Sequence, residues 1–245
     1  MADVDPRPSF YAARGTGRWR DWWTILHPPY TAWHLSYVVL GATIAPATDA
    51  VRLIGTLLAF FLAVGISAHA FDELHGRPLR TRISGRALWF AATTSLMGAV
   101  AIGVVGVARV GPGLLVFMAI GPVLVVGYNL EVFGGRLHTD AGFAAAWGVF
   151  PVLTAYFAQA EGLGLVALVG AAAAFALSYA QRCLSAPARM VRRRVGHVEG
   201  TVRMVDGSVR TVDRALLLGP LERALRALSW AMVALAVALL LARTT

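Results

Sequence analysis

Residues 67–79 place two histidines, two carboxylates and an arginine at the end of an apolar segment. Residues 51–68 are almost wholly apolar, and about 20 such residues are enough to cross a bilayer. If the helix continues to Glu73, then His69, Asp72 and Glu73 fall at i, i+3 and i+4 and share one face of its last turn. Such a face can hold a cation or a charged substrate at a membrane border.

The tripeptide Gly76-Arg77-Pro78 follows these acids directly. Gly and Pro end the helix there, which predicts that Arg77 is turned back toward the acid pair. An acid pair with a nearby arginine favours a metal-bridged phosphate group. The competing interpretation is a plain solvated helix end, because loops at membrane borders are normally polar.

The composition indicates an integral protein of the cell membrane. The chain has 245 residues, of which 58% are hydrophobic and only 14% charged, too apolar for a soluble domain of this size. The formal net charge is +9, and all 22 basic residues are arginine. Their placement in short loops between apolar segments indicates membrane orientation and attraction to anionic lipid heads, so no nucleic-acid partner is expected.

Seven apolar segments predict an all-α membrane bundle of about seven transmembrane spans. They cover about 31–46, 52–71, 87–108, 112–128, 142–159, 163–182 and 221–242. Pro151 predicts a kink in the fifth span and leaves one carbonyl that needs another donor. The Asp206-Gly207 pair, between alternating residues, predicts a β-hairpin.

The predicted domain organisation has four parts. It comprises an interfacial N-terminal segment (1–30), a transmembrane bundle (31–183), a basic loop with the hairpin (184–220) and a final transmembrane helix (221–245). With the N-terminus cytoplasmic and the C-terminus outside, 19 arginines are cytoplasmic and 3 are outside, as the positive-inside tendency requires. The polar residues expected to converge on one cytoplasmic cavity are then His69, Asp72, Glu73, Glu131, His138 and Asp140.

Several of these residues resemble motifs of the UbiA superfamily of intramembrane prenyltransferases. The segment 68–72 reads AHAFD where the family carries an N-D-x-x-D motif, and Asp72 matches its final acid. The Arg77-Pro78-Leu79 run is similar to the R-P-L that follows that motif, and Tyr128-Asn-Leu-Glu131 is similar to a tyrosine-containing segment after the fourth helix. The resemblance covers about residues 25–180, by order of spans and loops more than by identity.

The resemblance implies Mg²⁺-dependent prenyl transfer from an isoprenoid diphosphate or related lipid. The expected catalytic residues are Asp72, Glu131 and Asp140, and the expected metal ligands are Asp72 and Glu73, with His69 and His138 as ligands if the ion is a transition metal. The implied substrate-binding residues are His69, Arg77, Tyr128, Asn129, Arg136 and Arg182. The family's second acidic motif is absent from residues 181–189. Therefore Glu131 and Asp140 supply the missing ligands, or Arg182 and Arg189 bind the diphosphate directly, or the reaction differs.

Two other functions are compatible with the same residues. Histidine with carboxylate ligands is a common set for Zn, Mn or Fe, which His69, Asp72, Glu131, His138 and Asp140 could form. Alternatively, the chain is a non-enzymatic protein that binds or transports an isoprenoid or other lipid, with its basic loop at an anionic membrane. Neither the acceptor nor the oligomeric state is indicated by the sequence.

Overall fold

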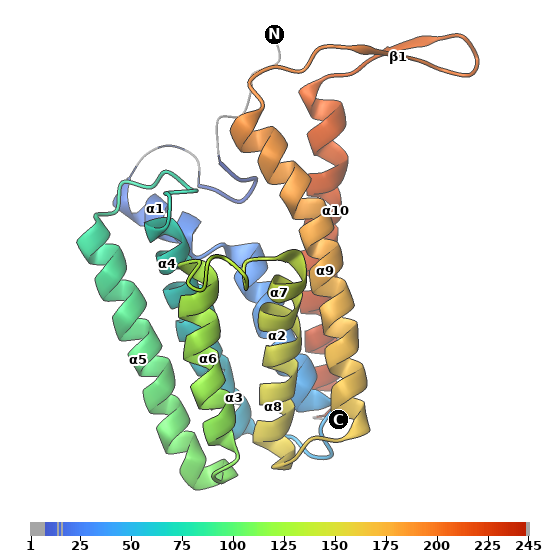
Figure 1. Cartoon of the computed structure of the whole chain (residues 1–245). Coiled ribbons are helices and arrows are strands. Elements are labelled where there is room, and N and C mark those ends of the chain that lie inside the picture. The colour runs from blue at the N-terminus through green and yellow to red at the C-terminus, as the bar shows by residue number, and fades with distance from the viewer. Residues whose placement is uncertain (1–7, 14, 16, 244–245) are drawn as a thin grey trace.

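The computed structural model describes residues 8–13, 15 and 17–243, which form a helical bundle with one small hairpin (Figure 1). The helices before the hairpin are α1 (Arg18–Ile25), α2 (Pro28–Thr43), α3 (Ala50–Phe60), η1 (Phe61–Ala68), α4 (His69–Leu74), α5 (Gly85–Val110), α6 (Leu114–Asn129), α7 (Asp140–Ala144), η2 (Ala145–Val149), α8 (Phe150–Ala160) and α9 (Leu165–Arg194). Strands β1 (Thr201–Arg203) and β2 (Val209–Thr211) pair antiparallel, and α10 (Arg214–Leu241) follows. The predicted hairpin is confirmed, with Gly207 at a φ of 84° in its turn.

The prediction of an all-α membrane bundle is confirmed at the level of its helices. Five continuous helical segments are long and apolar enough to cross a membrane: Ala50–Leu74, Gly85–Val110, Asp140–Ala160, Leu165–Arg194 and Arg214–Leu241. Two of them contain a π-helical stretch, η1 or η2. The other two predicted spans correspond to α2 and α6, which are shorter, with 16 residues each.

Helix α2 lies inside the bundle and packs against α8 and α10. Its Tyr37 and Val38 are fully buried. A side chain at Gly41 would collide with the backbone of Val152 in α8, so glycine is needed at this close approach. The central position of α2 brings residues near its start, including His34, under the end of the bundle from which the hairpin projects.

The predicted need of a partner for the carbonyl that Pro151 leaves free is confirmed. Proline has no N–H and cannot bond the carbonyl four residues earlier, which belongs to Trp147. The chain forms η2 over this stretch, directly before Pro151. The buried Nδ1 of His34 lies 3.0 Å from the Trp147 oxygen, and because a carbonyl only accepts, Nδ1 carries the proton. This freed carbonyl therefore fixes both the position and the tautomer of His34.

Helices α9 and α10 lie side by side and extend past the other helices at one end (Figure 1). With 30 residues, α9 is about 45 Å long, whereas the hydrocarbon core of a bilayer is about 30 Å thick. The predicted basic loop 184–220 is therefore longer than the observed one. Residues 184–194 belong to α9 and residues 214–220 to α10, so the segment that connects the two helices is 195–213. The basic run lowers hydropathy, but arginine and alanine are strong helix formers.

The projecting ends of α9 and α10 are joined by an almost buried ion pair. Arg192 Nε and Nη2 donate to the two carboxylate oxygens of Glu222 at 2.6 and 2.8 Å. The two side chains are only 6% and 11% exposed. A bidentate pair of this kind fixes the relative register of the two helices.

We expect Glu222→Gln to lower the free energy of unfolding by about 3 kcal/mol, because it leaves the buried charge of Arg192 without its partner. Thermal unfolding of the purified protein in detergent measures the change. Glu199→Gln is the matched control, since the Glu199 side chain is 87% exposed, and it should leave the midpoint unchanged. Equal midpoints for the two variants would contradict a structural role for this pair.

Candidate anion site at the polar end of the bundle

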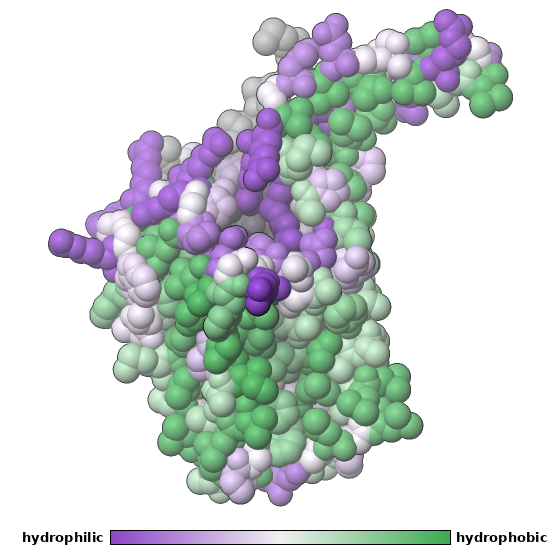
Figure 2. Space-filling view, in the orientation of Figure 1, coloured by the Kyte–Doolittle hydropathy of each residue, from purple (hydrophilic) through white to green (hydrophobic). Residues whose placement is uncertain are grey.

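Polar side chains gather at the end of the molecule from which the hairpin projects, while the flanks of the bundle are mostly apolar (Figure 2). We call this the polar end. It carries the described N-terminal residues, the loops 75–84 and 130–139, and the connection 195–213. The residues singled out in the sequence belong to these segments or to the adjoining helix ends.

Two histidines from different segments lie against each other at the polar end. The rings of His27 and His69 are 4.1 Å apart between centroids and tilted by 34°. His69 Nδ1 lies 3.1 Å from the carbonyl oxygen of Gly65, so Nδ1 carries the proton and Nε2 keeps its lone pair. His27 immediately precedes α2 in the left-handed conformation, with a φ of 46°. Its buried Nε2 has no hydrogen-bond partner among the described residues.

The charges of two arginines of α9 act on the acid of the predicted motif. Arg189 and Arg193 are one helical turn apart, and both act electrostatically on Asp72 and on His27. Arg189 Nη1 donates to the hydroxyl of Ser185 at 3.2 Å. Within the described part of the chain, Asp72 forms no ion pair within 4.0 Å. The carboxylate and the guanidinium groups therefore influence each other without being in direct contact.

Further polar atoms at this end are buried and unpaired. Among the described residues, Tyr128 OH, Gln181 Oε1 and Ser67 Oγ are buried without a hydrogen-bond partner. The charges that act on Tyr128 include those of Arg182, Arg189 and Asp72. Buried polar groups in folded proteins are normally paired, and leaving one unpaired costs about 1–3 kcal/mol. A polar ligand or water that reached any of these atoms would therefore be stabilised there.

The loop 130–139 supplies an outer set of contacts around Tyr128. His138 stacks on the Tyr128 ring at 4.5 Å between centroids, and its Nδ1 lies 3.2 Å from the Tyr128 carbonyl. Glu131 lies 3.7 Å from His138 Nδ1, and its side chain is 42% exposed. Arg182 Nε donates to Asp140 at 2.7 Å. His138 therefore contacts Tyr128 directly, and the half-exposed Glu131 lies beside His138.

Glu73 and Arg77 stabilise the loop that follows α4. The Glu73 side chain is fully buried. Its Oε2 accepts the Leu79 N–H, and its Oε1 accepts the N–H and hydroxyl of Thr81, each at 2.9 Å. Arg77 Nη1 donates to the carbonyl oxygen of Ile83 at 2.6 Å. These contacts contradict the expectations that Glu73 is a metal ligand and that Arg77 clamps phosphate, because their polar atoms stabilise residues 75–84.

Asn129 and Arg136 are the other residues that were expected to bind substrate. Asn129 Nδ2 donates to the carbonyl of Val125 one turn earlier, and Arg136 is exposed. Among the described residues, no three His, Cys, Asp or Glu side chains form a group that could hold a metal ion. The expected protein ligand set His69, Asp72, Glu73 and His138 is therefore not assembled there.

Sequence reasoning missed His27, Tyr11 and Arg193 as site residues. Arg182, Arg189 and Arg193 recur at i, i+7 and i+11, which places them on one face of a helix. The sequence contains this arginine pattern, but the prediction ended the sixth span at residue 182, so the arginines beyond it were not placed on a helix. No local pattern identifies His27 or Tyr11, because their place in the site depends on how the N-terminal residues pack.

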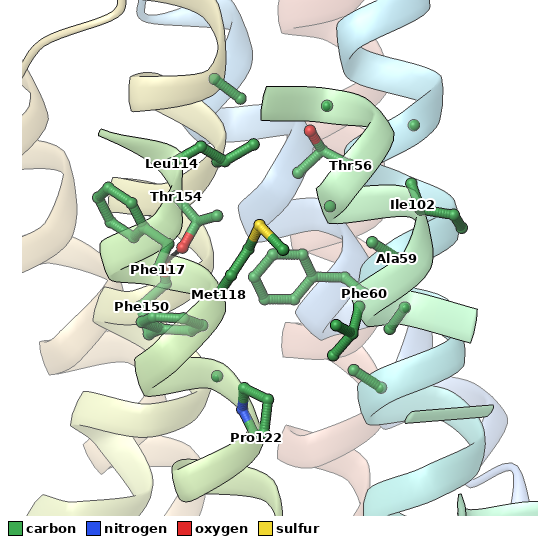
Figure 3. Close-up of a pocket in the computed structure, with 18 of the residues that line it drawn as sticks. Thr56, Ala59, Phe60, Ile102, Leu114, Phe117, Met118, Pro122, Phe150 and Thr154 are labelled. Carbon is green, nitrogen blue, oxygen red and sulfur yellow. Dashed lines mark hydrogen bonds between the residues drawn. The ribbon is translucent and has the colours of Figure 1, made fainter. Parts of the chain in front are cut away.

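An apolar cavity of about 220 Å³ lies deeper in the bundle, between α3, α5, α6 and α8 (Figure 3). Phe60 of α3 and Met118 of α6 face each other across it. Other residues of its wall are Thr56, Ala59, Ile102, Gly103, Leu114, Phe117, Phe150 and Thr154. A cavity with such a lining favours hydrocarbon over water.

Trp147 connects this cavity with the polar end. Its side chain lines the cavity, and its ring packs edge-on against Tyr128 with centroids 5.7 Å apart. Its backbone oxygen is the partner of His34 Nδ1. One residue of η2 therefore contacts both the apolar cavity and the polar residues above it.

Comparison of the chain with protein-family models, with curated proteins and with solved structures gives no match. The fold and the site define a helical protein of the membrane class with arginine and histidine side chains at one end and an apolar cavity below them. The resemblance to the UbiA superfamily stays a prediction from the residues.

We expect acid to destabilise the protein through His27. Burial holds the pKa of His27 well below its usual value, and the neighbouring His69 ring and the charges of Arg193 and Arg189 act in the same direction. Below pH of about 6.5 the unfolded chain therefore takes up a proton at this position that the folded chain does not. Stability is then lost as the pH falls, by at most about 1.4 kcal/mol per pH unit for this group.

Thermal unfolding in detergent between pH 7 and pH 5 measures this effect. The midpoint should fall less steeply for His27→Gln than for the unchanged protein. His197→Gln is the control, because the His197 side chain is 81% exposed, and it should keep the original slope. An unchanged slope in His27→Gln would show that other groups cause the acid sensitivity.

Proposed function

We propose that this protein binds an isoprenoid diphosphate, or a related lipid with a phosphate head, and acts on it within the membrane. The observation that carries the proposal is the set of Arg189 and Arg193 on α9, whose charges act on Asp72 and His27, together with buried polar atoms that have no partner among the described residues. Such an arrangement at the end of an apolar bundle suits an anionic head attached to a hydrocarbon chain.

The head would be bound chiefly by arginine. The planar guanidinium group presents parallel N–H donors that match phosphate oxygens, and bonds between charged groups are roughly twice as strong as neutral ones. The hydroxyl of Tyr128 is a further donor that has no partner among the described residues. This supports the alternative in which basic residues of α9 take the place of a second acidic motif.

Asp72 gives the proposed site a place for one Mg²⁺ ion. A carboxylate beside a diphosphate is repulsive unless a cation lies between them. Mg²⁺ is commonly held by one or two carboxylates together with substrate phosphates and water. Asp72 fits that role, even though no three acid or histidine ligands are grouped among the described residues. When bound, the ion would add to the neutralisation of the departing diphosphate.

The hydrocarbon chain would occupy the apolar cavity beyond Trp147. At about 220 Å³ the cavity is smaller than the ~300–1,000 Å³ of typical ligand pockets. It would therefore hold part of an isoprenoid chain, with the rest along the bundle or in lipid. Phe60, Phe117 and Phe150 line it, and their rings provide the apolar contact area that such a chain needs.

The proposed reaction is transfer of the prenyl group to an acceptor. The bond between C1 of the chain and the diphosphate oxygen breaks, pyrophosphate leaves toward Arg189 and Arg193, and C1 bonds to the acceptor. The acceptor's proton passes to Nε2 of His69, which keeps its lone pair because Nδ1 faces the Gly65 carbonyl. A non-enzymatic lipid binder would use the same head and chain sites without this step.

We expect Arg189→Gln to weaken binding of farnesyl diphosphate by about 10- to 100-fold, because a hydrogen bond to a charged group contributes about 1.5–3 kcal/mol. Equilibrium binding of radiolabelled farnesyl diphosphate to the detergent-solubilised protein measures the change. Arg194→Gln is the matched control, since Arg194 is exposed at the end of the same helix. Equal affinities in the two variants would remove Arg189 from the site, and no binding to the intact protein would refute the proposed function.

We expect Mg²⁺-dependent release of pyrophosphate from farnesyl diphosphate, and its loss in Asp72→Asn, because the amide is a poor Mg²⁺ ligand. A coupled pyrophosphate assay with and without chelator measures both effects. Asp206→Asn in the exposed hairpin turn should keep full activity. Tight binding without release, under all acceptors supplied, would favour the non-enzymatic lipid binder.

A further inference from the structure

The described N-terminal residues 8–13 lie across the polar end, and we call them the strap. Ser9 and Ala12 are only 6% and 4% exposed. Phe10 packs against Tyr30 at 6.1 Å between ring centroids, and the Ala13 N–H donates to the Thr24 hydroxyl at 3.1 Å. Although it is short and has no regular secondary structure, the strap is packed into the protein.

Tyr11 brings the strap over the candidate site. Its ring lies 5.0 Å from that of His27, between centroids. Burial raises the pKa of the Tyr11 hydroxyl, while the Ser9 hydroxyl and the charges of Arg193 and Arg189 act in the opposite direction. The strap therefore shares its surroundings with the arginines and histidine that would bind an anionic head.

Arg193 is the contact that ties the strap to the site. Its Nε donates to the carbonyl oxygen of Pro8 at 3.2 Å, and its Nη2 donates to the Ser9 hydroxyl at 3.4 Å. These two nitrogens form the side edge of the guanidinium group, which is one of the edges that bind a phosphate through two parallel bonds. The strap thus occupies an edge that a phosphate would use.

We propose that the strap is a gate over the head site, released when an anionic head takes this edge of Arg193. The inference rests on the proposed function and adds its regulation. A carbonyl and a hydroxyl are neutral acceptors at long distances, whereas a phosphate oxygen is charged and forms the stronger bond. An anion on Arg193 therefore displaces Pro8 and Ser9, and the strap loses its polar tie to α9. Release opens the site to water and to a polar acceptor.

A thiol introduced in the strap tests the gate. Ala12→Cys in a Cys183→Ser background places a single thiol at a buried strap position, and its rate of reaction with a water-soluble maleimide reports opening. We expect saturating farnesyl diphosphate to raise this rate at least tenfold. Adding Arg193→Gln should raise it to a similar extent without ligand, whereas adding Arg194→Gln should not.

Two controls separate the possible outcomes. Ala42→Cys in the same background reports global unfolding, because Ala42 is fully buried in α2, and its labelling rate should not change. Binding of farnesyl diphosphate is measured in parallel on each variant. Binding without faster labelling of the strap overturns the gate and leaves the proposed function intact. Absence of binding overturns the proposed function and ligand-driven release together. Slow maleimide labelling of the strap in the Arg193→Gln variant without ligand would show that the bonds from Arg193 do not hold the strap in place.

Discussion

The positive charge along one face of α9 is the constraint on which the polar end depends. Guanidinium groups that are partly removed from water need polar partners. Arg182 is paired with Asp140, Arg192 with Glu222, and Arg193 with neutral atoms of the strap. Arg189 contacts the neutral hydroxyl of Ser185. The two carboxylates thus fix the positions of α7 and α10. The contacts of Arg189 and Arg193 are with neutral groups, so their charges are not cancelled and act on Asp72 and His27.

Much of the fold follows from local sequence signals. Hydropathy places the long helices because a backbone in lipid must satisfy its own hydrogen bonds, and Asp206-Gly207 sets the hairpin because few residues accept a positive φ. Pro151 even indicates which carbonyl needs a new donor. The sequence could not show that His34 is that donor, since the two residues are 113 positions apart. Hydropathy also ended α9 too early and began α10 too late, because charged residues that favour helices lower hydropathy without ending a helix.

The candidate site could be predicted only in part. Asp72, Tyr128, His138 and Asp140 stand at helix ends, where turn chemistry reveals them; His138 stacks on Tyr128, and the charges of Asp72 and Asp140 act on Tyr128. Glu73 has the same residue type and the same neighbourhood as Asp72, yet its carboxylate is buried under residues 79–81. Adjacent positions on a helix point about 100° apart, so neighbouring acids can serve a site and a loop respectively. Sequence spacing alone did not reveal that Glu73 is the acid that binds the loop and that Asp72 is the one left for the candidate site.

The distortion of the helix at η2 relates the polar head site to the apolar cavity. Without a donor at Pro151, the carbonyl of Trp147 turns to His34, while the Trp147 ring lies between Tyr128 and the cavity wall. A ligand that used only the arginines would gain nothing from this cavity, and an apolar ligand would gain nothing from the arginines. Only a molecule with an anionic head and a hydrocarbon chain uses both. Because Trp147 contacts both regions, the cavity and the polar end adjoin at one residue, and an amphipathic lipid phosphate suits this arrangement better than a free anion.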